Sequence, residues 1–166
     1  MKSKKRKFAI ILMLASVLML CFSACAENPG VAGGDFAEQG SLKDALTTDG
    51  NTTVTLTNDE AIDLTGIDIK GRKEIFIDNC TLTLTGKYAL TQEGVFDIKP
   101  GEESGEGKID LSELQFDFTS LSADYPDEMS VIEVRSGVNI IEPAENDRID
   151  IRDFDVLKAI NVKRQS

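Results

Sequence analysis

The chain has 166 residues, with 18 basic and 29 acidic side chains, no histidine and no tryptophan. Its formal charge of −11 repels nucleic acid and anionic lipid, so the composition argues against a nucleic-acid partner. Without histidine, any acid–base chemistry falls to carboxylates, lysine, tyrosine or arginine.

The N-terminus has the pattern of a secretory signal. An apolar run from Phe8 to Leu20 is too short to cross a bilayer comfortably, but it matches the core of a signal peptide. A buried N-terminal helix would not explain the block of cations that precedes the run, which consists of Lys2, Lys4, Lys5, Arg6 and Lys7.

The stretch Phe22-Ser23-Ala24-Cys25 resembles a bacterial lipobox, although Phe22 replaces the aliphatic residue preferred there. The resemblance implies a signal peptide over 1–24 and a lipid on Cys25, which would anchor the protein to the outer face of the cell membrane. Residues 25–35 are small and glycine-rich, as a flexible tether should be. The alternative is an A-x-A site, with cleavage after Ala26 and release of a secreted protein.

Cleavage before Cys25 would leave 142 residues with 13 basic and 29 acidic side chains, a charge of −16. Cys80 is then the only thiol besides the anchor, so we expect no internal disulfide. We expect Cys80 to pack as a small hydrophobic residue.

One short helix is predicted near the start of the folded region. Ser41 and Asp44 are spaced like a capping box, which predicts a helical turn or two over 41–46. The runs that follow are rich in valine, isoleucine, threonine and phenylalanine and are broken by glycine, asparagine and aspartate, which is typical of β-strands.

These runs repeat with a base period of about 20 residues and polar insertions in the later units. Each unit has a first strand and then a strand–corner–strand stretch. The first strands are 54–56, 75–77, 95–98 and 131–134, and the stretches that follow them are 62–69, 82–90, 109–118 and 149–157.

This pattern resembles a right-handed parallel β-helix of the pectate-lyase-like architecture, an all-β solenoid of about four short turns over residues 36–166. The helix over 41–46 resembles the N-terminal cap of such proteins. The leucine-rich repeat is a rival solenoid, but its signature does not occur. A two-sheet sandwich is the rival fold without repeats.

The alternation within the strands predicts which side chains face the core. Leucine and isoleucine at 62, 64, 82, 84, 109, 111, 149 and 151 should point inward. In the first strands the phase is unresolved, because Ile75 and Ile77 would leave Phe76 outside, whereas Phe96 and Ile98 suit the opposite phase.

An acidic row is predicted on the outside of one sheet. Asp110 and Asp150 should be neighbours there, and like charges directly opposite each other are destabilising. Either Arg148 and Arg152 neutralise them or a cation lies between them. Calcium suits oxygen ligands, and the aspartates that could bind it are Asp110, Asp147, Asp150, Asp153 and Asp155.

Few aromatic side chains are available to contact a sugar. Tyr125 lies in the insertion 119–130, where we expect it to be exposed and consider it a ligand contact, with a structural Tyr-Pro turn as the alternative. Tyr88 is expected on the core side or at the rim of its strand.

The leading hypothesis is non-catalytic binding or adhesion at the cell surface, to a polysaccharide or a surface protein, with calcium as the only cofactor considered. A polysaccharide lyase or glycoside hydrolase is the second reading. The tryptophan- and histidine-containing motifs of pectate lyases are absent, and no residue is assigned as catalytic. The third is a structural module that stacks on another chain through an open coil end after Ile160.

Overall fold

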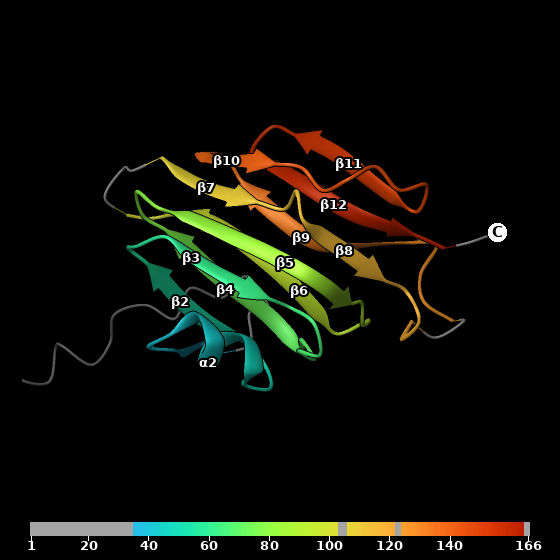
Figure 1. Cartoon of the computed structure of the whole chain (residues 1–166), viewed down its shortest axis with the longest axis horizontal. Helices are drawn as coiled ribbons and strands as arrows, with labels where there is room; N and C mark the ends of the chain where they lie inside the picture. The colour runs from blue at the N-terminus through green and yellow to red at the C-terminus, as the bar shows by residue number, and fades with distance from the viewer. Residues whose placement is uncertain (1–34, 103–105, 122–123, 165–166) are drawn as a thin grey trace, which may run out of the picture. The chain divides into compact units, whose positions relative to one another are not determined.

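The computed structural model describes residues 35–102, 106–121 and 124–164, which lie in one compact unit. The predicted signal peptide, Cys25 and all but the last residue of the predicted tether lie outside the described residues. Figure 1 shows the strands of this unit stacked from α2 at one end to β11 at the other.

Two sheets make up the unit. The order in the seven-stranded sheet is β1 (Ala37–Glu38), β2 (Thr52–Leu56), β4 (Gly71–Ile77), β6 (Gly94–Pro100), β9 (Glu128–Arg135), β12 (Leu157–Lys163) and β11 (Ile149–Phe154). The order in the five-stranded sheet is β10 (Val138–Ile141), β7 (Gly107–Asp110), β5 (Thr81–Ala89) and β3 (Glu60–Asp63), with β8 (Leu114–Asp117) pairing the second half of β5.

The predicted helix is confirmed as α2 (Leu42–Thr47). Ser41 is its N-cap: the hydroxyl accepts from the Asp44 amide at 3.1 Å and donates to the Asp44 carboxylate at 2.7 Å. This arrangement satisfies an amide that the first helical turn would otherwise leave unpaired. Leu42, Ala45 and Leu46 face the core.

The first strands of the four predicted units pair in parallel, in the order expected. Ile75 is opposite Val54 on one side and Ile98 on the other, and Ile98 is opposite Val134. The unresolved phase is settled by this register. Because Ile75 pairs with Ile98 rather than with Val95, both Ile75 and Phe96 point into the core and Phe76 points outward.

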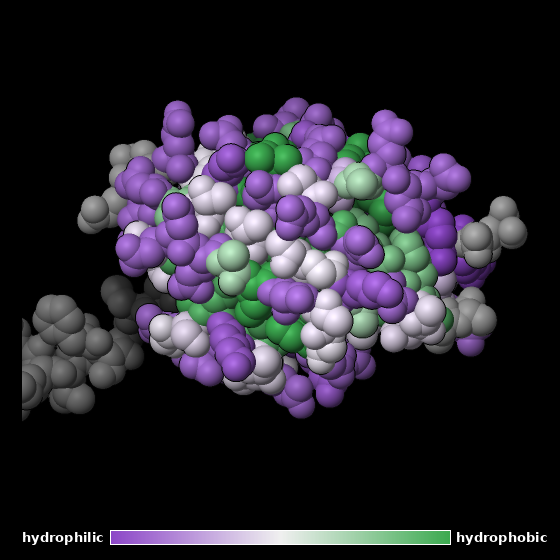
Figure 2. Space-filling view, in the orientation of Figure 1, coloured by the Kyte–Doolittle hydropathy of each residue, from purple (hydrophilic) through white to green (hydrophobic). Residues whose placement is uncertain are grey.

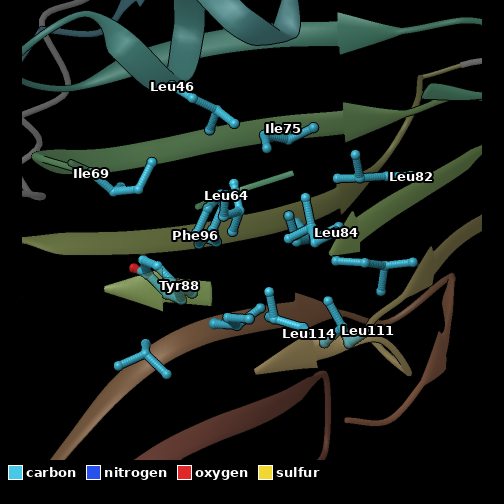
Figure 3. Packing of buried hydrophobic residues seen from close by; sticks show 14 of the residues in the cluster. Leu46, Leu64, Ile69, Ile75, Leu82, Leu84, Tyr88, Phe96, Leu111 and Leu114 are labelled. Carbon is cyan, nitrogen blue, oxygen red and sulfur yellow. The ribbon is translucent and has the colours of Figure 1, made fainter. Parts of the chain in front are cut away.

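The core fills the space between the two sheets. Leu64, Leu82, Leu84, Ile109 and Leu111 are fully buried, as the alternation predicts. Figure 3 shows these leucines converging on side chains of the other sheet. Ile62, Ile149 and Ile151 are partly buried and pack against the core. Cys80 is buried, and its thiol contacts the Leu56 carbonyl at 3.3 Å, so it packs as predicted.

A lysine is buried among these apolar side chains. Lys73 is 0% exposed and points inward from β4. Its ammonium donates to the carbonyls of Thr48 and Gly50, at 2.6 and 2.9 Å, just beyond the end of α2. A cation at this place complements the negative end of the helix dipole.

The predicted right-handed parallel β-helix is wrong, because the seven-stranded sheet is mixed. β12 pairs antiparallel with both β9 and β11, and only Asp155 and Val156 separate β11 from β12. A two-residue connection can join only antiparallel strands, since a parallel crossover needs a dozen or more residues. The stretch 149–157 is therefore half of a hairpin and not a fourth copy of the unit, and β10 takes the expected place beside β7.

Candidate functional site

The predicted acidic row is divided between the two sheets. Asp110 is in β7 of the five-stranded sheet, and Asp150 is in β11 of the seven-stranded sheet, so their expected adjacency is wrong. Asp110 accepts hydrogen bonds from the Ser112 amide and hydroxyl, at 3.0 and 2.7 Å, which lower its pKa. Asp63 and Asp117 hold Thr65 and Thr119 in the same kind of turn.

Asp150 is neutralised by cations of its own sheet. Lys163 Nζ lies 3.1 Å from it and Arg152 Nε donates to it at 2.6 Å, and together they lower its pKa. Neutralisation by Arg152 is thus confirmed for this carboxylate.

The other predicted calcium ligands do not join it. Asp153 lies 3.4 Å from Lys158, and Asp147 and Asp155 are exposed. Within the described ranges no three acidic or thiol side chains come together as a possible metal site. Calcium binding stays a prediction.

The expected exposure of Tyr125 is wrong. Its side chain is 4% exposed, and its hydroxyl donates to the Lys163 carbonyl at 3.1 Å. Arg148 donates to the same hydroxyl at 2.6 Å while its guanidinium lies 3.9 Å from the centre of the Phe118 ring. These contacts fasten the loop before β9 to β12, so Tyr125 has the structural role that was the alternative.

The outer face of the seven-stranded sheet carries a dense charged cluster that the sequence did not single out. The outer-face network consists of three cations, Arg72, Lys99 and Arg135, and three anions, Glu74, Asp97 and Glu133. Its members come from β4, β6 and β9, which are neighbours in the sheet. The only signal in the sequence was an aspartate inside the apolar run Val95-Phe96-Asp97-Ile98.

Asp97 is the centre of the outer-face network. Its side chain is 3% exposed although it points away from the core, because the two arginines cover it. Burial alone would raise the pKa of Asp97, but hydrogen bonds from Arg135 and Arg72 outweigh that effect and hold the pKa below its usual value. The carboxylate is therefore a fixed anion that sets the positions of the cations around it.

Beside the outer-face network lies a hollow with an aromatic wall. The Phe76 hollow has a volume of about 430 Å³ and is lined by Thr55, Thr57, Phe76, Asp78 and Glu102. Phe76 is opposite Thr55 on β2 and Lys99 on β6, and the Lys99 ammonium lies 5.5 Å from the centre of its ring.

The sequence showed that burying Ile75 and Ile77 would leave Phe76 outside, but it did not indicate a binding site there. The hollow combines a ring, two hydroxyls and two carboxylates on an open surface. Such a surface can stack against an apolar ring face and accept hydrogen bonds from hydroxyl groups. Two carboxylates on its wall favour a neutral or cationic ligand over an anionic one.

Comparisons with known proteins give no relative for this chain: no family model, no curated protein and no solved structure matches it. Among the helices of the described residues, none has the length and apolar character needed to cross a membrane.

Proposed function

We propose that this chain is an exported, non-catalytic binding protein, anchored to the outer face of a bacterial membrane through Cys25, and that it binds a polysaccharide in the Phe76 hollow. The observation that carries the proposal is the outward position of Phe76 between two threonines and two carboxylates. The ring of Phe76 points away from the core and is only half-buried, so one part of it is open to a ligand at the wall of the hollow.

The chemistry of the hollow suits a neutral polymer. The apolar face of a sugar ring stacks on an aromatic side chain, and the sugar hydroxyls donate to carboxylates. Asp78 and Glu102 would repel the uronates of an acidic polysaccharide unless a cation lay between. Calcium-dependent binding of acidic polymers is therefore the form in which the calcium prediction can be tested.

The state of the carboxylates supports binding rather than hydrolysis. Among the described carboxylates whose pKa is shifted, all are lowered, and each is held by a hydroxyl, an amide or a cation. A glycosidase needs one carboxyl group whose pKa is raised so that it can donate a proton.

The test is binding of the purified chain to a panel of neutral and acidic polysaccharides, each with calcium and with chelator. We expect a neutral polymer to bind wild type, and Phe76→Ala to weaken binding about tenfold or more, in line with the loss of one stacked ring. Ile141→Ala is the matched control, because Ile141 is an exposed apolar residue of the other sheet.

Binding that survives Phe76→Ala, or that Ile141→Ala weakens equally, would move the ligand away from the hollow. Failure of every polymer to bind would overturn the polysaccharide proposal and leave a surface protein as the partner. New reducing or unsaturated ends after incubation would show an enzyme instead.

A further inference from the structure

The seven-stranded sheet ends in a strand with an open edge. β11 pairs with β12 on one side, and no strand of the described residues pairs with its other side. Phe154 and Val156, at the tip of the same hairpin, are 56% and 61% exposed. Figure 2 shows hydrophobic patches among hydrophilic side chains at the end of the unit where β10 and β11 lie.

The hydrogen-bond pattern shows which groups face the open edge. The Lys163 amide donates to the Arg148 carbonyl at 2.8 Å, and paired residues alternate along an antiparallel ladder. Asp150 and Arg152 therefore bond to β12, whereas the main-chain groups of Ile151 and Asp153 point away from it. Within the described residues β11 thus presents a donor and acceptor row for another strand.

β11 can pair antiparallel with itself in three registers centred near its middle, on Asp150, Ile151 or Arg152, and the charges that these registers oppose distinguish them. A register centred on Asp150 opposes two carboxylates, and one centred on Arg152 opposes two guanidinium groups. A register centred on Ile151 places Asp150 of each copy opposite Arg152 of the other, twice by symmetry. Like charges directly opposite each other are destabilising and opposite charges stabilise, so among these three registers only the one centred on Ile151 is favoured.

We propose that the chain forms a two-fold symmetric dimer in which β11 pairs antiparallel with β11 of a second copy, centred on Ile151. The two Ile151 residues exchange main-chain hydrogen bonds, and their side chains meet on the inner face of the joined sheet. There they extend the apolar surface that Ile149 and Ile151 form beside a hollow of about 290 Å³. The interface is isologous, so it closes and does not propagate.

The charge on each copy limits the strength of this dimer. The described unit is strongly acidic, and two acidic bodies repel each other over a Debye length of about 10 Å at 0.1 M salt. One strand pair also buries less surface than a standard stable interface. The dimer is therefore expected at high protein concentration and not at low concentration.

The first test is sedimentation velocity of the full chain in a mild non-ionic detergent across a range of concentrations. Wild type should change from monomer to dimer as its concentration rises. Arg152→Glu opposes carboxylates in the pair and should raise the dissociation constant about tenfold or more. The double variant Asp150→Arg with Arg152→Asp exchanges the two charges and should restore the dimer.

Lys70→Glu is the matched control, since it makes the same change of charge at an exposed ion pair outside β11 and should leave the dimer intact. The proposal is overturned if wild type stays monomeric at every concentration, or if Lys70→Glu weakens association as much as Arg152→Glu. The Ile151 register would also be overturned if the double variant with exchanged charges did not recover the dimer.

A second measurement reports the register directly. Ile151→Cys places two thiols opposite each other across the two-fold axis, so mild oxidation should give a covalent dimer. Asn139→Cys, on the edge strand of the other sheet, is exposed and should not cross-link. Cys80 is buried and should not compete. Equal cross-linking of both variants would reject the β11 interface.

Discussion

Arg72 and Asp97 lie on neighbouring strands of the seven-stranded sheet, and the Nε and Nη2 atoms of Arg72 both donate to Asp97 Oδ2, at 3.1 and 2.7 Å. Arg135 Nε donates to the other carboxylate oxygen at 3.1 Å. One buried anion thus joins β4, β6 and β9 on the face opposite the core. β4 and β9 are not paired with each other, so Asp97 with its two arginines and the Arg72–Glu133 ion pair connect them across β6.

Asp97→Asn should lower the free energy of unfolding by about 2–4 kcal/mol. Breaking a buried ion pair by removing one partner costs about 3–5 kcal/mol, and the low end applies because both arginines are about a third exposed. Chemical denaturation measures the change. Asp68→Asn is the control, because Asp68 forms a surface ion pair with Lys70 and should cost less than about 1 kcal/mol.

The same carboxylate predicts acid sensitivity. The folded-state pKa of Asp97 is lowered from 3.8, so its stabilisation is present above the unfolded-state pKa and is lost as the pH falls through the folded-state value. Wild type should therefore lose stability steeply below about pH 4, and Asp97→Asn should lose less. Parallel pH profiles for the two proteins would show that Asp97 does not carry this dependence.

Gly71 should not tolerate alanine. Its φ of 78° is in the left-handed region, and an added Cβ would lie 2.4 Å from the Gly50 carbonyl carbon and oxygen. The left-handed backbone and the overlap with Gly50 together should lower the free energy of unfolding of Gly71→Ala by more than about 3 kcal/mol. Gly66 has a φ of 77° with nothing within 4 Å of such a Cβ, so Gly66→Ala should cost only about 1 kcal/mol. Thermal unfolding of both variants separates overlap from conformation.

The parts of the fold that could be predicted from the sequence depend on local rules. The capping pair Ser41 and Asp44 acts within one helical turn, and the alternation that buries Leu82 and Leu84 depends only on strand geometry. Parallel pairing of the first strands followed from their regular spacing. The hairpin was missed because 149–157 was matched to the repeat, although Asp155 and Val156 leave no room for a crossover.

The outer-face network and the Phe76 hollow could not be predicted because they depend on register between distant strands. Arg72 and Glu133 are 61 residues apart in sequence. They meet only because Ile75 pairs with Ile98 and Ile98 pairs with Val134. A shift of that register by one residue would send Asp97 into the core and Phe96 outward.

Tyr125→Phe should lower the free energy of unfolding by about 1–2 kcal/mol, because its hydroxyl loses the bond to the Lys163 carbonyl and the bond from Arg148. Tyr88→Phe is the comparison. Tyr88 is fully buried, but its hydroxyl has one long contact, 3.4 Å, with the Gly94 carbonyl. Tyr88→Phe should therefore lower the free energy of unfolding by less than Tyr125→Phe does. The reverse order would contradict the structural role of Tyr125.

Lys73 gives a pH dependence in the same direction as that of Asp97, but in the alkaline range. Burial lowers its pKa from 10.5, so above the folded-state value the unfolded chain binds more protons than the folded one. The free energy of unfolding should therefore rise as the pH increases from the folded-state pKa towards 10.5. Lys73→Met removes the group, so the difference in stability between wild type and Lys73→Met should shift in favour of wild type over that range.

Lys70, which directly precedes β4, should show the opposite pH dependence of stability. Asp49 and then Asp68 raise its pKa, so its contribution is lost as the pH rises through the folded-state value. The stability difference between wild type and Lys70→Met should shift against wild type as the pH rises from 10.5 through the folded-state value. Differences of the same sign for the two lysines would mean that the bonds from the Lys73 ammonium to the Thr48 and Gly50 carbonyls outweigh the effect of its burial. Two lysines three residues apart would then differ in exposure but not in the sign of their linkage to folding.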